Sequence, residues 1–333
     1  MTTQLKVQLY ENKEQLNHTH VTEFILLGFG DHHQLLLILL FLLFLFIYIV
    51  TMAGNILIIL LVATDRHLHT PMYFFLGNLS CLETFCSSNI LPRMLSSFLT
   101  GRKVISVNAC FVQHYFFGFF GGVECYLLSA MSYDRYLAIC KPLHYVTMMN
   151  GKLCFQLIVS SWFSGFLSIT MTTIIMSKLV FCGDNKIDHF FCDTFPIIEL
   201  FCGDTSTLKW YIYVLCSVFT FPPSILTFTS YTFIIIAIMK IPSATGKQKA
   251  FSTCSSHLLV VTIFYGTLMA VYVIPNTDRL NALHKVFSIC YTILTPMINP
   301  IIYSLRNKEV KEAVRRHISF LVVQKEKKRL KIC

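Results

Sequence analysis

The sequence predicts an all-α membrane protein, built as a bundle of seven transmembrane helices followed by a short amphipathic eighth helix. Of its 333 residues, 55% are apolar and only 13% are charged, whereas soluble domains carry about a quarter charged residues. The apolar residues gather in seven long runs, and about 20 helical residues cross a hydrocarbon core of roughly 30 Å. Since backbone polar groups find no water there, each run must be helical. This pattern excludes a disordered chain and disfavours a soluble enzyme.

The seven runs divide the chain into a tail, a bundle and a basic end. Residues 1–34 are polar and form the expected extracellular tail, without a cleavable signal peptide, so the first run must direct insertion. The bundle covers 35–305. Residues 306–333 are expected to form an amphipathic helix on the membrane, with apolar residues every four positions from Val310 to Ile318, and a basic tail. The predicted spans are 35–62, 72–91, 108–139, 153–176, 210–239, 250–274 and 286–305.

The net charge of +10 indicates orientation rather than a nucleic-acid partner. If the C-terminus is cytoplasmic, that side carries 17 Lys and Arg against five acidic residues, while the other side carries ten of each. Basic residues concentrate on the cytoplasmic side of membrane proteins, which places the N-terminus outside. We therefore expect a multi-pass plasma-membrane protein that binds no nucleic acid and whose basic residues 325–331 contact membrane lipid.

This orientation places two kinds of modification outside the cell. The sequon at Asn17 lies in the tail and is expected to carry a glycan, whereas the sequon at Asn78 lies within a span. Four of the 13 cysteines lie outside, where disulfides persist, and they allow three pairings. These four are Cys110, Cys182, Cys192 and Cys202. An alternative reading is a zinc or copper site at His189, Cys192 and Asp193.

Two carboxyl groups lie at the depth of the membrane, Glu83 in the second span and Glu124 in the third. A carboxylate is expensive at this depth and usually marks a functional site. A protonated Glu with a hydrogen bond inside the bundle is the alternative. The residues alone leave both possibilities open.

Two further features indicate a conformational switch. Asp134 and Arg135 lie at the cytoplasmic end of the third span, where a guanidinium can exchange one carboxylate partner for another; a snorkelling interfacial arginine is the alternative. In the seventh span, Pro296 and Pro300 each remove a backbone hydrogen bond, and Asn299 can satisfy a freed carbonyl. We expect this helix to be kinked and able to shift.

Six ordered motifs resemble the olfactory receptor family of rhodopsin-like G protein-coupled receptors. The resemblance runs from about residue 23 to 316 and departs at Ser132, where the family usually has Ala, and at Glu83, where Asp is commoner. The motifs are Gly54-Asn55, PMYFFL at 71–76, MSYDRYLAIC at 131–140, Ser230-Tyr231, KAFSTCSSH at 249–257 and PMINPIIY at 296–303.

The resemblance implies an odorant receptor of olfactory sensory cilia rather than an enzyme. Its expected partner is a heterotrimeric G protein of the stimulatory, olfactory type, which raises cyclic AMP. The resemblance also implies a Cys110–Cys192 bridge, which leaves Cys182 for Cys202. No cofactor is expected except a possible sodium ion or proton in a cavity lined by Glu83, Glu124, Asn55 and Asn299. The motif residues expected to form the switch are Asp134, Arg135, Tyr136, Tyr231, His257, Asn299, Pro300 and Tyr303.

The ligand cavity is expected between the outer halves of the helices. Helical spacing places one set of residues on the third span: His114, Phe117, Gly118, Gly121 and Gly122. The resemblance adds Leu215, Cys216, Phe219, Tyr265, Leu268, Met269, Tyr272 and Thr292. None of these is charged, and burying an unpaired charge costs several kcal/mol. We therefore expect a small, neutral, largely apolar ligand.

Two other functions compete with this reading. An ion-coupled transporter could use Glu83 and Glu124 as a proton relay, but it would favour an internal repeat with interrupted helices in each half, which the sequence lacks. A receptor for a peptide or lipid is disfavoured by the motifs and by the short loop near Asp278. The common motifs of hydrolases, zinc proteases and phosphate loops are absent.

Overall fold

A computed structural model describes residues 21–30, 33–181, 185–273, 281–307 and 309–319. Six helices are long: α2 (Gln34–Thr64), α3 (Pro71–Thr100), α4 (Val107–Cys140), α6 (Gly151–Met176), α8 (Ser206–Met239) and α9 (Ala244–Tyr272). The seventh crossing consists of α10 (Asn281–Ile289), the π-helical segment η3 (Cys290–Leu294) and α11 (Thr295–Arg306). The short elements are β1 (Glu23–Leu26), η1 (Arg66–Leu68), β2 (Val104–Ser106), α5 (Pro142–Met148), β3 (Lys186–Ile187) and α7 (Thr194–Ile198).

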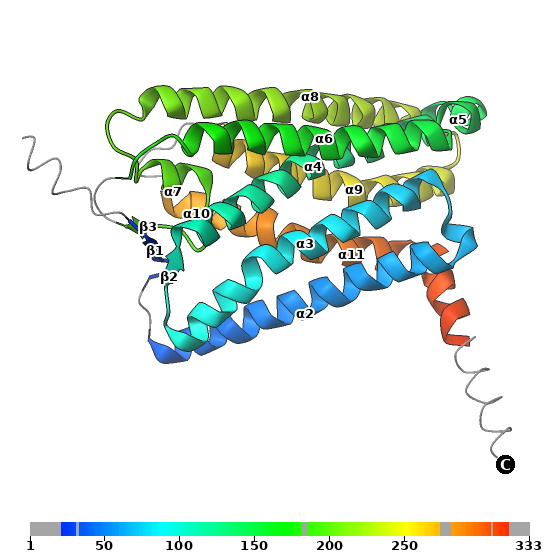
Figure 1. Ribbon diagram of the computed structural model, residues 1–333. Coiled ribbons are helices and arrows are strands. Elements are labelled where there is room, and N and C mark those ends of the chain that lie inside the picture. The colour runs from blue at the N-terminus through cyan, green and yellow to red at the C-terminus, as the bar shows by residue number, and fades with distance from the viewer. Residues whose placement is uncertain (1–20, 31–32, 182–184, 274–280, 308, 320–333) are drawn as a thin grey trace, which may run out of the picture.

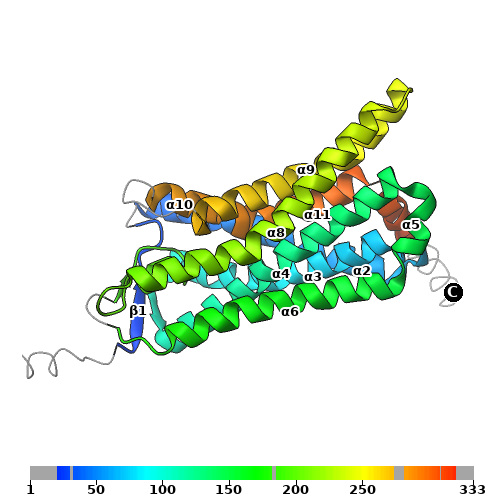
Figure 2. The ribbon, with the colours of Figure 1, turned by 90° about the horizontal axis from the view of Figure 1, so that it is seen from above.

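The long helices run side by side as one bundle, with the sheet and α7 at one end and α5 at the other (Figure 1). At the end that carries α5, the ends of α8 and α9 project beyond the other helices (Figure 2). Helix α4 lies at the centre of the bundle and packs on α3, α6 and α8. The fold is the predicted seven-helix bundle.

The helices bury their polar side chains inside the bundle and expose apolar ones. Four segments in the described residues are long and apolar enough to cross a membrane: Gln34–Thr64, Gly151–Met176, Ser206–Met239 and Leu283–Ile302. In α2, the outward side chains Leu35, Leu39 and Phe46 are all more than half exposed. Helix α4 is less apolar because it carries buried polar groups such as Gln113, Glu124 and Ser132. Lipid solvates the outer faces, while the inner faces must pair their polar atoms with one another.

The second crossing is longer than the predicted 72–91, because Pro92 does not end α3. A proline removes one backbone donor, and lipid-embedded helices tolerate that loss. The helix continues to Thr100 and ends at Gly101, whose φ of 66° is left-handed and favours glycine. This extension makes Arg93 part of the helix.

The proline residues shape the seventh crossing in a specific way. Pro296 has no N–H to donate to the carbonyl of Thr292, and the π-helical turn just before it closes instead with the Thr295 N–H bonded to the Cys290 carbonyl. Pro300 likewise leaves the Pro296 carbonyl without its helical donor. Asn55 Nδ2 of α2 supplies that donor at 3.3 Å, so Asn55, not the predicted Asn299, satisfies the freed carbonyl.

A small sheet joins the N-terminal segment to two loops. Strand β1 is central, antiparallel to β2 and parallel to β3, with Glu23 opposite Ser106 and Ile25 opposite both Val104 and Lys186. Sequence patterning does not predict this sheet, because strands of two to four residues are too short to show alternation. Phe24 at its centre is fully buried, so the sheet fastens the N-terminal segment to the bundle.

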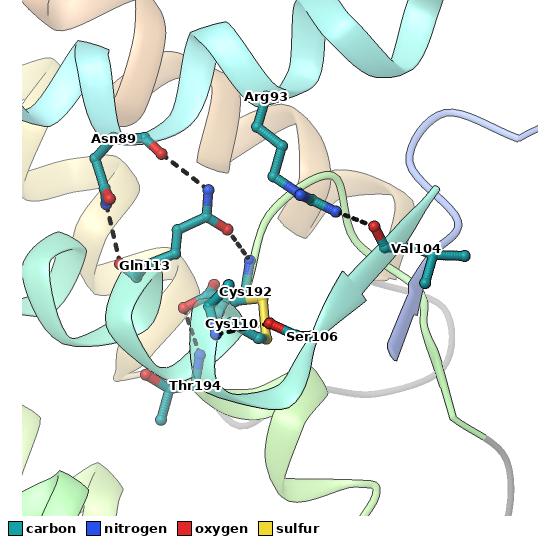
Figure 3. The surroundings of a disulfide bond; sticks show 10 residues. Asn89, Arg93, Val104, Ser106, Cys110, Gln113, Cys192 and Thr194 are labelled. Atoms are coloured by element: carbon teal, nitrogen blue, oxygen red, sulfur yellow. Dashed lines mark hydrogen bonds between the residues drawn. A yellow bond between two sulfur atoms is a disulfide. The ribbon is translucent and has the colours of Figure 1, made fainter. Parts of the chain in front are cut away.

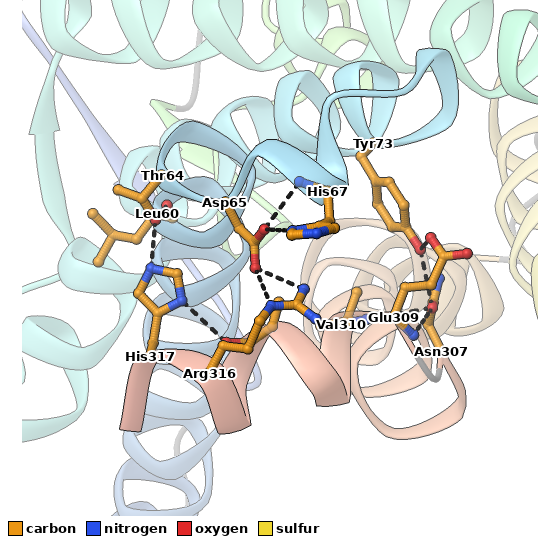
Figure 4. A network of polar contacts seen from close by, with 11 residues as sticks. Leu60, Thr64, Asp65, His67, Tyr73, Asn307, Glu309, Val310, Arg316 and His317 are labelled. Carbon is orange, nitrogen blue, oxygen red and sulfur yellow. Dashed lines mark hydrogen bonds and ion pairs between the residues drawn. The ribbon is translucent and has the colours of Figure 1, made fainter. Parts of the chain in front are cut away.

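The opposite end is closed by the predicted amphipathic segment. Residues 309–319 are helical, with Val310 buried and Ile318 exposed. Arg316 donates from Nε (3.0 Å) and Nη2 (2.7 Å) to Asp65 Oδ2, while Tyr73 donates to Glu309 Oε2 at 2.8 Å (Figure 4). These contacts dock the helix on η1 and the start of α3.

Candidate ligand cavity and switch region

A cavity lies inside the bundle between α4, α6, α8, α9 and η3. Its volume is about 110 Å³, and its walls are mainly apolar. This composition is typical of small-molecule sites. Nine of the thirteen predicted ligand residues line it: Phe117, Gly118, Gly121, Gly122, Leu215, Cys216, Phe219, Leu268 and Tyr272.

Four predicted ligand residues do not line this cavity. His114 is fully buried, and both of its ring nitrogens lack a hydrogen-bond partner within the described residues. Tyr265 turns its hydroxyl to the Cys125 carbonyl (2.5 Å), and Thr292 donates to the Ser288 carbonyl (2.6 Å). Met269 is partly exposed and lies outside the lining. Helical spacing suggested His114 and the resemblance suggested the other three, but neither signal shows the hydrogen bond that turns a side chain away.

The fourth crossing contributes a wall that the sequence analysis missed. Helices α4 and α6 approach so closely that a Cβ on Gly122 would lie 2.8 Å from the Gly165 Cα. This contact carries α6 residues to the cavity edge. Small residues on both helices were the available signal. The additional lining residues are Cys86, Glu124, Cys125, Ser168, Ile169, Thr172, Thr194, Ile212, Thr220, Phe264 and Tyr291.

Glu124 corrects the expectation that the lining carries no acidic group. Its side chain is buried, lines the cavity, and has one oxygen, Oε1, without a hydrogen-bond partner in the described structure. Sequence analysis assigned Glu124 only to the cation site. The helix places it between the two sites, so a ligand in the cavity meets one carboxyl group.

The predicted Cys110–Cys192 disulfide is present and fastens the loop before α8 to the top of α4. Gln113 reinforces it, because its Oε1 accepts from the Cys192 N–H at 3.1 Å and its Nε2 donates to the Asn89 carbonyl at 2.9 Å (Figure 3). Cys202 is also disulfide-bonded; its predicted partner Cys182 lies outside the described residues, as do Asn17 and residues 325–331.

Asp193 joins this loop to the cavity. Its Oδ1 accepts from the Tyr272 hydroxyl at 2.5 Å and from the Thr194 N–H at 2.7 Å, and Tyr272 in turn lies 2.9 Å from the Tyr291 hydroxyl. Burial raises the pKa of Asp193 to about 6, although these two hydrogen bonds act in the opposite direction. Tyr272, Thr194 and Tyr291 line the cavity, so the loop and the cavity share one polar chain.

The metal alternative at the loop finds no support in the described residues. Cys192 is consumed by the disulfide, and no group of three or more His, Cys, Asp or Glu side chains there is arranged to hold a metal ion. Burial lowers the pKa of His189 to about 3. His189 is therefore a neutral side chain packed between Phe190 and Phe191, with ring centroids 4.6 Å from each.

The four residues of the expected cation site gather in the bundle core. Asn299 Nδ2 donates to Glu83 Oε1, and Glu83, Asn55 and Asn299 are at most 1% exposed. One oxygen of each residue has no hydrogen-bond partner in the part of the chain that the structure describes: Glu83 Oε2, Glu124 Oε1, Asn55 Oδ1 and Asn299 Oδ1. Unsatisfied buried oxygens of this kind fit a hard cation such as sodium, or a proton.

Five of the predicted switch residues lie toward the end of the bundle that carries α5, whereas Asn299 belongs to the polar cluster of the bundle core. Asp134 accepts from the Tyr145 hydroxyl of α5 at 2.8 Å, and Arg135 Nη2 lies against the Met72 sulfur. Tyr231 of α8 shares a hydrogen bond with His257 Nδ1 of α9. The ring of Tyr136 lies 6.0 Å from Phe233. The side chain of Tyr303 lies outside the described part of the chain, whereas Pro300 lies where a Cβ on Gly54 would clash at 2.8 Å.

Comparisons with known proteins agree with this architecture. The family model described as "Olfactory receptor" matches residues 44–320. Human olfactory receptor 10A7 is 49% identical over 93% of this chain and 98% of its own length, and mouse olfactory receptor 1M1 is 46% identical over 92% and 97%. Squid rhodopsin has the same fold, with a TM-score of 0.63 at 18% identity over 88% of each chain. The chain therefore belongs to the olfactory receptor family, on the rhodopsin-like fold of G protein-coupled receptors.

Proposed function

We propose that this receptor binds a small, neutral, largely apolar odorant in the bundle cavity and activates a stimulatory, olfactory-type G protein that raises cyclic AMP. Membership of the family makes the chain a multi-pass plasma-membrane receptor for odorants that couples to a heterotrimeric G protein. The observation that carries the proposal is the cavity, whose apolar walls include few polar groups. Affinity then comes mainly from buried area, which favours micromolar binding.

The carboxyl group of Glu124 refines the ligand chemistry. Together with Thr172, Thr220 and Tyr272 it offers hydrogen-bonding groups along an otherwise apolar wall. A ligand with one hydroxyl, carbonyl or ether oxygen fits this lining. A permanently anionic ligand would meet a like charge or a neutral acid, and no Lys or Arg lines the described cavity.

Filling the cavity tests its role. A Cβ on Gly121 would meet no atom within 4 Å, so Gly121→Val places its methyl groups in the cavity rather than in the packing. We expect the potency of the best odorant in a cyclic-AMP assay to fall at least tenfold, with normal surface expression. Gly266→Val is the control, since Gly266 is also unobstructed but does not line the cavity. An unchanged Gly121→Val response would argue against this cavity as the odorant site.

On activation, we propose that α9 moves away from Arg135 and opens a cleft for the G protein. The support is the Tyr231–His257 bond between α8 and α9 beside the Asp134-Arg135 pair. A ligand can drive this movement only through its higher affinity for the open state. Arg135→Ala should abolish the cyclic-AMP response while the receptor still reaches the surface. A full cyclic-AMP response from Arg135→Ala would contradict the mechanism. A cyclic-AMP response of the wild type to odorant would exclude the alternative that the protein acts only as a transporter.

The polar cluster around Glu83 is proposed to hold a sodium ion or a proton that favours the resting state. Its support is the set of four unsatisfied oxygens and the closeness of two carboxyl groups, which cannot both ionise easily without a cation. Glu83→Gln combined with Glu124→Gln should weaken the dependence of activation on sodium and pH. If activation of the double variant depends on sodium and pH as in the wild type, Glu83 and Glu124 have only a structural role.

The proposed orientation has the N-terminus outside, with the receptor in olfactory cilia. The support is the excess of basic residues on the side of α5 and the C-terminus. Antibody against a C-terminal tag should stain only permeabilised cells, and a glycan at Asn17 should be removable from intact cells by a glycosidase. Staining of the tag on intact cells would reverse this orientation.

A further inference from the structure

A second cavity lies at the end of the molecule that carries the sheet, outside the bundle. It is enclosed by residues 26–30, by Leu37 of α2, by the last turns of α3, by residues 101–103 and by Phe190. Its volume is about 160 Å³, against about 110 Å³ for the ligand cavity. The two cavities share no lining residue. The second cavity is therefore a separate space that the odorant site does not explain.

One side of this cavity is hydrocarbon-like. The Phe29 ring stacks on Phe190 at 5.5 Å and on Phe98 at 6.0 Å between ring centroids. Leu26, Leu37 and Met94 complete this side. On the same end of α2, Leu35 and Leu39 are 62% and 53% exposed, so lipid chains cover the helix beside the cavity. An apolar chain can lie here without meeting a polar wall.

The other side is cationic. Arg93, Arg102 and Lys103 line the cavity, and none of the described lining residues is acidic. Asp188, at the same end of the molecule, is already paired with Lys285 at 2.6 Å, and the Lys285 ammonium lies 3.4 Å from the Gly28 carbonyl. Arg93 and Arg102 are thus the cations on which this side of the cavity depends, and no acidic side chain of the described lining faces them.

Arg93 is incompletely satisfied in a way that indicates a missing acceptor. Its Nη2 donates to the Val104 carbonyl at 2.6 Å (Figure 3). Its Nε is buried and has no hydrogen-bond partner among the described residues. A guanidinium has five donors in a planar fork that matches a carboxylate or phosphate. A buried donor without an acceptor is costly, and an anionic oxygen would remove that cost.

We propose that this cavity binds an amphiphile with one anionic head group and a hydrocarbon chain, and that a long-chain fatty-acid anion is its simplest form. The head group pairs with Arg93, assisted by Arg102, and the chain lies along Phe98, Leu37 and the lipid-exposed side of α2. Both halves of the ligand are needed, because the cations alone would hold an anion only weakly in water. The proposal is independent of the odorant and of the G protein.

The test measures binding of tritiated oleate to the purified full-length receptor in nanodiscs of zwitterionic phosphatidylcholine. We expect oleate to bind saturably. Methyl oleate, which keeps the chain without the charge, and butyrate, which keeps the charge without the chain, should not bind. Arg93→Gln should weaken oleate binding at least tenfold, and Arg93→Lys should restore part of it. Lys178→Gln is the control, because Lys178 is an exposed cation at the same end that lines neither cavity.

Several outcomes decide the proposal. Equal binding of oleate and methyl oleate, or undiminished binding by Arg93→Gln, would overturn it and leave Arg93 as an interfacial anchor. The ester comparison uses only the wild-type receptor, so it holds even if Arg93→Gln folds poorly. Nanodiscs containing phosphatidylglycerol separate the sources of the anion: competition with oleate would show that a lipid phosphate occupies the same site, and absence of competition would restrict the site to the free carboxylate.

Discussion

The Asp193 side chain connects the loop before α8 to the ligand cavity through hydrogen bonds. It is 2% exposed, yet it carries two hydrogen bonds that favour its ionised form. Burial nevertheless dominates and raises its pKa to about 6, well above 3.8. Because Tyr272 and Tyr291 extend this contact into the lining, the charge on one carboxyl group affects the donors that a ligand meets.

The raised pKa predicts a specific dependence of stability on pH. The folded state binds the Asp193 proton more tightly than the unfolded state, so protonation favours folding. This contribution is absent above about pH 6 and grows as the pH falls toward about 4, to about 3 kcal/mol at most. The thermal midpoint of the wild type should therefore rise relative to that of Asp193→Asn between pH 7.5 and 4.5. His189 and His284 are present in both proteins, so their titration is common to both curves.

Asp188→Asn is the matched control for this measurement, since Asp188 is an exposed acid of the same loop. It should keep the wild-type dependence on pH. If Asp193→Asn and the wild type respond to pH in parallel, the Asp193 carboxyl group does not titrate in this range, and burial does not raise its pKa to about 6.

The packing of α4 on α6 decides the shape of the ligand cavity. A Cβ on Gly165 would lie 2.6 Å from the Phe119 carbonyl oxygen and 2.7 Å from the Val123 nitrogen, and neither backbone atom can move without its helix. Close approach of two helices through small residues is a general device of membrane proteins. The same approach brings Ser168 and Thr172 to the cavity wall.

Gly165→Ala should therefore separate the two helices and lower the free energy of unfolding by about 1 to 3 kcal/mol. Gly266→Ala is the control, because its added Cβ meets nothing within 4 Å, and it should leave stability unchanged or raise it slightly. Thermal unfolding of both purified variants checks this expectation. Equal thermal midpoints for the two variants would mean that α6 shifts to accommodate the added methyl group without loss of stability.

Sequence analysis predicts the helices better than their inner contacts. Seven apolar runs and six motifs identify the bundle and its family, because both signals are local in the chain. Hydrogen bonds turn the side chains of Tyr265 and Thr292 away from the cavity. Thr172 reaches the cavity wall through the contact between α4 and α6, which joins residues far apart in the sequence. Glu124 shows the limit most clearly, since the sequence assigned it only to the polar cluster with Glu83, whereas its side chain also lines the cavity.

The molecule is fastened at both ends, at one by the sheet and disulfide and at the other by the docked segment 309–319. The latter contact is a two-pronged ion pair from Arg316 to Asp65, supported by the His67 N–H at 3.0 Å. Although burial raises the pKa of Asp65, the bonds from Arg316 and His67 outweigh it and lower the pKa to about 2. The contribution of this carboxylate is lost only as the pH falls below about 4.

Removing this pair should loosen the docked segment without unfolding the bundle. Asp65→Asn should increase hydrogen exchange of residues 309–319, by an amount corresponding to about 1 kcal/mol, because Arg316 is partly exposed. Arg315→Gln, at an exposed neighbouring position, should leave the exchange of this segment unchanged. Equal exchange in Asp65→Asn and wild type would show that apolar contacts such as Val310 hold the helix alone.

The central strand of the small sheet also imposes an order on biosynthesis. Residues 23–26 leave the ribosome before any of their partners, and the parallel partner of Ile25 is Lys186, four membrane crossings later. Until that loop has been made, β1 can pair with β2 through Phe24 and Ile105, but its other edge has no strand partner. A chain arrested before β3 thus carries an open strand edge beside the apolar Phe24, and the sheet is complete only after the first four crossings have been synthesised.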